Sequence, residues 1–223
     1  MTPYYQDGAV TIYHGDCREI VPTLGRFDLL LTDPPYGISL NTDNSRFSGG
    51  NSASVSRRGN KVGPAGGKPI AGDGEPFDPS WLPELAHKSI IWGWHCFPNM
   101  LPRGSCLVWI KRNDDAFGSF LSDAETAWFS NGHGVYCFKD LSNNAIARQR
   151  VHPTQKPLAL MTWCIGLAGD AQTILDPFAG SGTTGRAAKD LGRKAVLIER
   201  EERYCEIAAR RMSQEVLALG GTA

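Results

Sequence analysis

The stretch LLLTDPPYG, residues 29–37, decides how the rest of the sequence is interpreted. Its apolar run is bounded by turn-forming residues, a pattern typical of a strand buried on both faces in a parallel sheet. Pro34 and Pro35 donate no backbone hydrogen bond, and each restricts the preceding residue to extended geometry, so the strand ends there. Open α/β sheets bind ligands outside the carboxyl ends of their strands. We therefore expect Asp33 and Tyr36 to stand at the rim of an active site.

Strand, turn and helix patterns follow one another along the chain. Residues 10–13 predict a strand, residues 18–24 a helix and residues 27–32 the next strand, and so short a crossover fits a parallel sheet. Further strands are predicted at 89–93, 105–110, 136–138, 173–175 and 195–198, and helical segments at 123–128, 158–167, 186–191 and 201–219. This succession predicts a doubly wound α/β fold with a mostly parallel sheet.

The composition suits a single globular domain. A chain of 223 residues buries roughly 70% of the surface that it exposes when unfolded. Its six cysteines include no C-x-x-C pair, which argues against a zinc site and against a disulfide scaffold. The amino terminus lacks the blocks of a signal peptide, and no apolar stretch reaches the length of a membrane span. We expect one cytoplasmic domain, residues 1–223, without a metal or a membrane partner.

Residues 41–75 form an insertion of a different composition, rich in Asn, Ser, Gly and Pro. Its basic residues are unmatched by acidic ones between Asn44 and Gly72, and they are Arg46, Arg57, Arg58, Lys61 and Lys68. Loops of this length are usually functional or disordered. Two interpretations stay open: a solvated flexible insert, or a basic arm that contacts the phosphates of nucleic acid.

A second signal, GSGTTG at residues 180–185, lies between a predicted strand and a predicted helix. It fits the G-x-G-x-x-G pattern that lets nucleoside cofactors approach the backbone, and Glu199 ends the next strand, where it can accept two ribose hydroxyls. Asp176, just before the turn, would repel the pyrophosphate of a dinucleotide but suits the positive groups of S-adenosylmethionine. The charge favours the methyl donor, and an NAD-linked oxidoreductase stays open as an alternative.

Four motifs together resemble those of the DNA amino-methyltransferases. DPPY at 33–36 is similar to their catalytic motif, DPFAGSGT at 176–183 to their cofactor loop, HPTQKP at 152–157 to the element ahead of that loop, and HGDC at 14–17 to their amino-terminal G-D-C. Because the catalytic motif precedes the cofactor motif, the chain resembles the circularly permuted β class. The resemblance implies the Rossmann-like fold of S-adenosylmethionine-dependent methyltransferases, and compact chains of this sort resemble phage or orphan enzymes.

The resemblance also implies a role for each matching residue. Glu199 would bind the ribose, Asp16 the adenine side of the cofactor, and residues 178–182 its methionine portion, with Thr154 and Lys156 near the methionine end. The implied catalytic residues are Asp33, Pro34, Pro35 and Tyr36. The implied cofactor-binding residues are Asp16, Thr154, Lys156, Asp176, Phe178, Ala179, Gly180, Ser181, Gly182, Thr183 and Glu199.

The residue types predict a direct methyl transfer. An exocyclic amine is a poor nucleophile because its lone pair is delocalised into the base. If the Asp33 carboxylate and the Pro34 carbonyl accept its two hydrogens, the nitrogen can pyramidalise and attack the sulfonium methyl group in line, so that the new N–C bond forms as the S–C bond breaks. Tyr36 would stack on a base extruded from double-stranded DNA. Methylation of a cytosine ring carbon would use a cysteine after a proline, and no P-C dipeptide is present.

The target base is predicted from one position. In this family an aspartate at the position of Asp33 is commoner with adenine and a serine with cytosine, so we expect the adenine 6-amino group. The cytosine 4-amino group remains an alternative, as does an RNA or protein amine.

Two departures from the family concern specificity. The segment between Trp109 and His152 is shorter than a usual recognition region, and WGWHCF at 92–97 lacks the family's usual central residues. The recognition sequence in DNA is then short or relaxed, or its recognition depends on residues 41–75 and on the partner in a homodimer.

Overall fold

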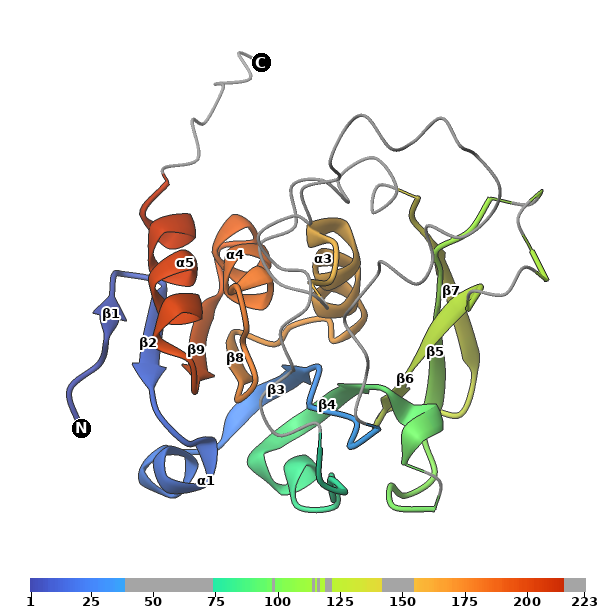
Figure 1. Cartoon of the computed structure of the whole chain (residues 1–223), viewed down its shortest axis with the longest axis horizontal. Coiled ribbons are helices and arrows are strands. Elements are labelled where there is room, and N and C mark those ends of the chain that lie inside the picture. The colour runs from blue at the N-terminus through green and yellow to red at the C-terminus, as the bar shows by residue number, and fades with distance from the viewer. Residues whose placement is uncertain are drawn as a thin grey trace, which may run out of the picture.

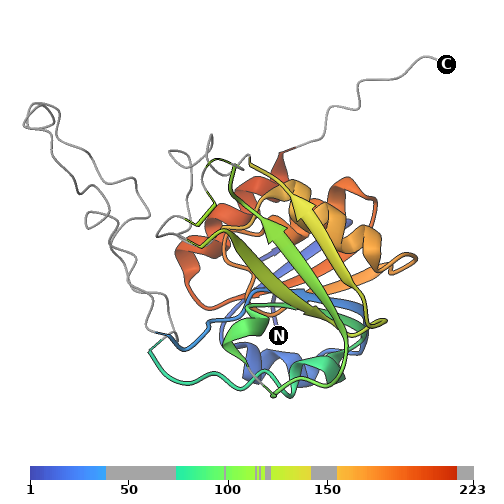
Figure 2. The ribbon, with the colours of Figure 1, turned by 90° about the vertical axis from the view of Figure 1, so that its right-hand side faces the viewer.

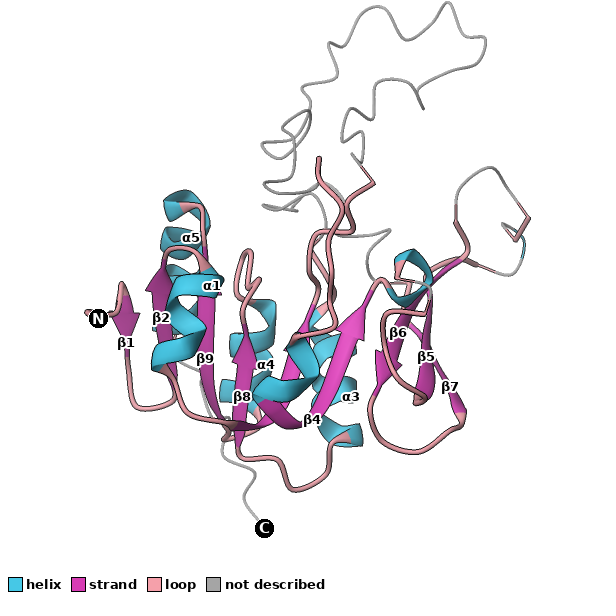
Figure 3. Cartoon of the chain, turned by 90° about the horizontal axis from the view of Figure 1, so that it is seen from below, coloured by secondary structure: helices cyan, strands magenta, loops and turns pink. Residues whose placement is uncertain are grey.

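A computed structural model describes residues 1–38, 74–97, 99–113, 115, 117–118, 122–141 and 155–214. They form a nine-stranded sheet with the order β1-β2-β9-β8-β3-β4-β6-β5-β7, visible as one row in Figure 3. The strands are β1 (Tyr5–Gln6), β2 (Val10–His14), β3 (Phe27–Thr32), β4 (Ala86–Trp92), β5 (Ser105–Ile110), β6 (Ala124–Phe129), β7 (Val135–Lys139), β8 (Thr173–Asp176) and β9 (Lys194–Glu199). The helices are α1 (Cys17–Ile20), α3 (Leu158–Leu167), α4 (Thr183–Asp190) and α5 (Glu202–Ser213), with 3-10 turns η1 (Val21–Thr23), η3 (Leu82–Leu85) and η4 (Trp94–Cys96).

The sheet is mostly parallel, which confirms the predicted fold class. Strands β2, β9, β8, β3 and β4 run parallel, whereas β1 is antiparallel at one edge. Figure 1 shows α3, α4 and α5 on one side of the sheet and α1 on the other. Each side has its own hydrophobic core, one beneath α3 to α5 and one beneath α1, η1 and η3.

The strand β3 confirms the first prediction from the sequence. Leu29, Leu30 and Leu31 are fully buried, and β3 is hydrogen-bonded to β4 on one side and β8 on the other. A continuous apolar run is what a strand covered on both faces requires.

The predicted helical turn at 123–128 is wrong. All of these residues but Asp123 belong to β6, which pairs antiparallel with β4 and with β5 at the end of the sheet that faces the viewer in Figure 2. Trp128 lies opposite both Ile91 and Cys106. Pairing on both edges thus outweighs the helical propensity of the alanines and the glutamate in this segment.

Three predicted helices have different bounds, and the one expected at 186–191 is α4, which begins at Thr183 and ends at Asp190. The helix expected at 18–24 is divided into α1 and η1, because Pro22 cannot donate a hydrogen bond within a continuing α-helix. The last helix, expected at 201–219, is α5, and the end of that prediction lies outside the described residues.

Between β8 and β3 the chain connections change direction, and this point predicts the position of a ligand-binding site. The chain passes from β3 to its neighbour β4 on one side, and from β8 through α4 to β9 on the other. Strands β2 and β3 are parallel as predicted, but β9 and β8 lie between them. A topological switch point of this kind is where open α/β sheets bind ligands.

Candidate active site

Acidic residues stand at the carboxyl ends of four neighbouring parallel strands. Asp16 follows β2, Glu199 ends β9, Asp176 ends β8 and Asp33 follows β3. Asp33 and Asp176 therefore flank the switch point. A small cavity there is lined by both, by Lys156 and by the residues of the glycine turn between β8 and α4.

The Asp176 carboxylate is buried and surrounded by donors. The Thr32 hydroxyl donates to Oδ1 at 2.8 Å and the Thr184 hydroxyl to Oδ2 at 2.6 Å. The backbone N–H of Phe178 donates to Oδ1 at 3.1 Å. Burial outweighs these hydrogen bonds and raises the pKa of Asp176 to about 6. This carboxylate thus changes charge close to neutral pH.

Glu199 is bonded to the glycine turn. Its Oε2 accepts from the backbone N–H of Gly180 at 2.8 Å, and its Oε1 from that of Glu201 at 2.7 Å. Burial raises the pKa of Glu199. A carboxylate has about four acceptor positions, so these two bonds leave capacity for the hydroxyls of a ribose.

The glycine turn holds the amino end of α4 against α5. Gly180 and Gly182 have φ angles of 51° and 77°, in the left-handed region that favours glycine. A Cβ on Gly182 would lie 2.8 Å from the Cβ of Ala208 on α5. Ser181 and Thr183 are buried beside it, and Arg211 donates to the Thr183 hydroxyl at 2.9 Å.

Asp33 contacts a phenol and an ammonium group. Tyr36 donates its hydroxyl hydrogen to Oδ1 at 2.5 Å, and the Lys156 ammonium is paired with Oδ2. The ammonium also lies 3.1 Å from Oε2 of Glu125 on β6. Lys156 was predicted beside the cofactor; its ammonium reaches Asp33, while the residue also lines the cavity at the glycine turn.

Tyr36 is held by the segment 92–97, where the sequence departs from the family. Its ring packs edge-on against His95 and Phe97, with ring centroids 6.2 and 6.1 Å away. Gly93 has a φ of 84°, and a Cβ there would lie 2.2 Å from the Tyr36 ring. The unusual segment thus forms the wall that places the predicted catalytic ring.

Asp16 has a structural role at the start of α1. It is the N-cap of α1, and its Oδ1 accepts from the backbone N–H of Arg18 at 2.9 Å. Its predicted contact with the adenine side of a cofactor stays a prediction. Thr154 and the predicted DNA-binding residues, Arg46, Arg57, Arg58, Lys61 and Lys68, lie outside the described residues.

Sequence reasoning missed Glu125, because its segment was assigned to a helical turn. As a strand, residues 124–129 would have placed Glu125 on the same face as the apolar Ala127 and Phe129, since side chains alternate along a strand. A charged residue at a core-facing position is rare, and this is the signal by which Glu125 could have been identified from the sequence. The described residues contain no group of three or more His, Cys, Asp or Glu side chains that could hold a metal ion, and no helix long and apolar enough to cross a membrane.

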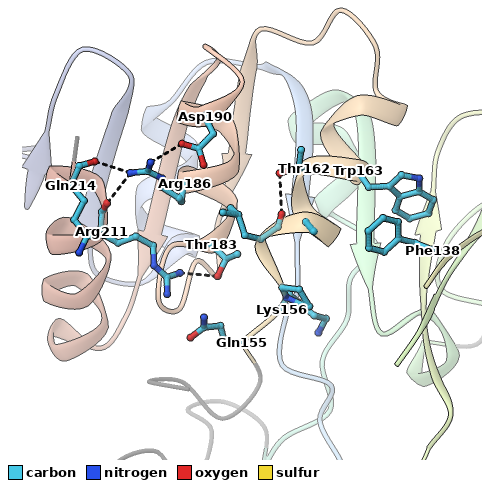
Figure 4. Close-up of a pocket in the computed structure, with 13 residues that line it drawn as sticks. Phe138, Gln155, Lys156, Thr162, Trp163, Thr183, Arg186, Asp190, Arg211 and Gln214 are labelled. Atoms are coloured by element: carbon cyan, nitrogen blue, oxygen red, sulfur yellow. Dashed lines mark hydrogen bonds and ion pairs between the residues drawn. The ribbon is translucent and has the colours of Figure 1, made fainter. Parts of the chain in front are cut away.

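A larger cavity of about 930 Å³ opens next to the site on the side of α3, α4 and α5 (Figure 4). Arg186 and Arg211 line one end, and the stacked rings of Phe138 and Trp163 line the other. It shares Gln155 with the cavity beside Asp33. The side-chain oxygen of Gln155 is buried and has no hydrogen-bond partner in the described part of the chain.

The sequence matches a family model and several curated relatives, among them two type II methyltransferases. The model describes DNA methylases, with N6 and N4 enzymes in its name, and matches residues 70–210. The chain is 34% identical over 115 residues to the type II methyltransferase M2.LlaDCHI of Lactococcus lactis subsp. cremoris, a match that spans 48% of this chain and 41% of that protein. It is 25% identical over an alignment of 260 residues to the type II methyltransferase M.ScaI of Streptomyces caespitosus, across 97% of this chain and 86% of that protein.

Solved structures share the fold. The M1.HpyAVI complex with S-adenosylmethionine has a TM-score of 0.56 at 20% identity and covers 92% of this chain and 100% of its own. The PvuII DNA methyltransferase, which is cytosine-N4-specific, has a TM-score of 0.58 at 13% identity and covers 97% of this chain and 90% of its own. Such distant likeness supports the α/β methyltransferase fold.

Proposed function

The chain belongs to the DNA methylase family of N6 and N4 enzymes, and from this premise we propose that it methylates the 6-amino group of adenine in double-stranded DNA. The methyl donor is S-adenosylmethionine. The observation that carries the proposal is the switch point between β8 and β3, where the glycine turn and Asp33 stand on adjacent strands. This arrangement supports a cofactor site directly beside an acceptor for an amine.

The residues at the switch point fit this cofactor. S-adenosylmethionine carries an ammonium and a sulfonium group, and the buried Asp176 carboxylate offers the negative charge that suits both. Gln155 lines the same cavity, and its unpaired side-chain oxygen is an acceptor that suits the ammonium. Glu199 would bind the ribose hydroxyls. The remaining contacts that we propose come from Asp16, Thr154, Lys156, Phe178, Ala179, Gly180, Ser181, Gly182 and Thr183.

The proposed transfer depends on positioning. When bound, the cofactor supplies an electrophilic methyl group. Asp33 and the carbonyl of Pro34 accept the two amine hydrogens, so that the lone pair of the nitrogen points at that methyl group. Pro34 is buried and Pro35 cannot extend the strand, so both acceptors are fixed before the substrate arrives. Tyr36 stacks on the extruded base.

Adenine is the proposed base because the catalytic motif begins with Asp33. The cytosine 4-amino group is the second candidate, because the family includes N4 enzymes. Membership of a DNA methylase family disfavours the NAD-linked oxidoreductase and the RNA or protein amine methyltransferase.

Incubation with labelled S-adenosylmethionine and duplex DNA, followed by nucleoside analysis, tests activity and base together. We expect the label in N6-methyladenine. Label in N4-methylcytosine would establish the second candidate. The absence of label from duplex DNA of every sequence tried would contradict the proposal.

Asp33→Ala should reduce transfer by at least about a hundredfold, because one preorganised acceptor is lost. Its affinity for S-adenosylmethionine, measured by calorimetry, should stay within about twofold. Asp170→Ala is the matched control, since Asp170 is exposed just before β8 at the opposite edge of the sheet. Near-normal turnover of Asp33→Ala would exclude the proposed mechanism.

A further inference from the structure

A cluster of charged side chains adjoins Asp33, and the proposed transfer does not account for it. This charge cluster consists of Asp33, Lys156, Glu125 and Lys111, which come from the end of β3, the segment before α3, β6 and the end of β5. The Lys156 ammonium lies between Oδ2 of Asp33 and Oε2 of Glu125, and Lys111 lies 2.7 Å from Oε1 of Glu125. Two carboxylates thus face two ammonium groups.

The position of Lys156 demands a permanent anionic partner. Its side chain is only 7% exposed, whereas Asp33 and Glu125 are 19% and 23% exposed. The rings of Trp92 and Tyr36 lie 5.7 and 5.9 Å from the ammonium and add a favourable seat for a cation. Leaving a buried charge without its partner is strongly destabilising.

Ionisation of the cluster follows from its charges. Burial lowers the pKa of Lys156, but Asp33 and Glu125 outweigh burial and raise it well above its usual value. Burial raises the pKa of Glu125, but Lys156 and Lys111 outweigh burial and lower it to about 2. Lys156 is therefore an ammonium and Glu125 a carboxylate across the working range of pH.

The pairing of Lys156 with Asp33 conflicts with the proposed transfer. Oδ1 of Asp33 accepts from Tyr36 and Oδ2 from Lys156. An amine hydrogen of the target base needs one of these two carboxylate oxygens as its acceptor. The Lys156 ammonium already donates an N–H to Oδ2, where the N–H of the base would have to donate. The Lys156 ammonium must then leave Oδ2 of Asp33 when the base binds. The other anion that contacts this ammonium is Glu125, 3.1 Å away.

We propose that Glu125 is a positioning residue for the methyl transfer: it holds the Lys156 ammonium when the target amine takes the place of that ammonium on Asp33. The inference rests on the proposed function, adds Glu125 to its machinery and gives Lys156 a second role. Lys111 supports the exchange, because it balances the second oxygen of Glu125 and keeps that carboxylate in place.

Glu125→Gln tests the exchange, because Lys156 then has Asp33 as its one anionic partner in the cluster. We expect at least about a tenfold loss in kcat/KM for DNA, with unchanged affinity for S-adenosylmethionine. Glu125→Asp should restore most of the activity, since it keeps the charge. At saturating S-adenosylmethionine, which offsets the loss of the proposed Lys156 contact to the cofactor, Glu125→Gln combined with Lys156→Gln should be more active than Glu125→Gln alone, because the competitor for Asp33 is gone. A double variant no better than the single, or a fully active Glu125→Gln, would overturn the inference.

A stability measurement tests the same arrangement without activity. Asp33→Asn and Glu125→Gln each leave Lys156 one carboxylate, whereas the double variant leaves it none. The thermal midpoint of the double variant should therefore fall by more than the sum of the two single shifts. Additive shifts would contradict a shared hold on Lys156 even if no DNA substrate were found. Glu84→Gln, exposed in η3, is the control for loss of a carboxylate elsewhere.

Discussion

Asp33 and Asp176 both lie at the carboxyl ends of adjacent strands, yet their surroundings differ. Asp176 accepts hydrogen bonds from two hydroxyls and a backbone N–H, all neutral donors. Asp33 is paired with an ammonium group and a phenol. In the proposed function, the first arrangement offers a buried negative charge to a cationic ligand, and the second offers a carboxylate to an amine.

The affinity for S-adenosylmethionine should depend on pH through Asp176. Burial raises the pKa of this carboxyl to about 6, so it is neutral in more acidic solution and attracts a cation less. The dissociation constant should rise by up to about tenfold per pH unit below this pKa. Calorimetry from pH 5 to pH 8 measures the trend, and Asp176→Asn should flatten it. A constant affinity in the native protein would contradict the role of Asp176.

The same pKa has the opposite effect on the unliganded fold. Because the pKa of Asp176 in the folded protein is raised above its ordinary value of 3.8, the contribution of Asp176 to stability is complete below that value and is lost as the pH rises through about 6. The cofactor and the unliganded fold thus favour different protonation states of one carboxyl.

Individual elements were predictable where one signal sufficed. The strand β3 followed from a continuous apolar run, and the glycine turn from its spacing between β8 and α4. Strand β6 was not predictable in this way, because its pairing with β4 and β5 joins segments far apart in sequence. The contact of Glu125 with Lys156 depends on that pairing and was missed with it.

The junction of α4 and α5 depends on Gly182. Gly182→Ala should lower the free energy of unfolding by roughly 2–4 kcal/mol, because it adds left-handed backbone strain and a contact with the α5 backbone. Gly192→Ala is the matched control: its φ is 66°, and nothing lies within 4 Å of its Cβ, so it should cost only about 1–2 kcal/mol. Denaturant unfolding compares the two. Equal losses would mean that the helix contact contributes nothing.

At the scale of the molecule, the sequence predicted which residues lie at the carboxyl ends of the strands, but not the order of the strands in the sheet. The late strands β8 and β9 lie between the early strands β2 and β3, which brings residues from both ends of the chain to one edge. Asp33, Asp176 and Glu199 were each predictable as strand ends, because each follows an apolar run. Their adjacency required the resemblance to a permuted family, since local patterns do not encode the order of strands.

The distribution of charge over the whole molecule makes the insertion at residues 41–75 the expected source of its affinity for DNA. The chain has no net charge, and the five basic residues between Asn44 and Gly72 leave an acidic excess elsewhere. Neutralising Arg57, Arg58 and Lys61 together should flatten the slope of log K against log salt by up to about 3, since each phosphate contact contributes about 0.9. Titration of labelled duplex DNA at several salt concentrations measures the slope. Arg103, Lys194 and Arg210, which are exposed, form the matched control when neutralised together. An equal slope in the two triple variants would show that the basic arm does not bind the phosphates.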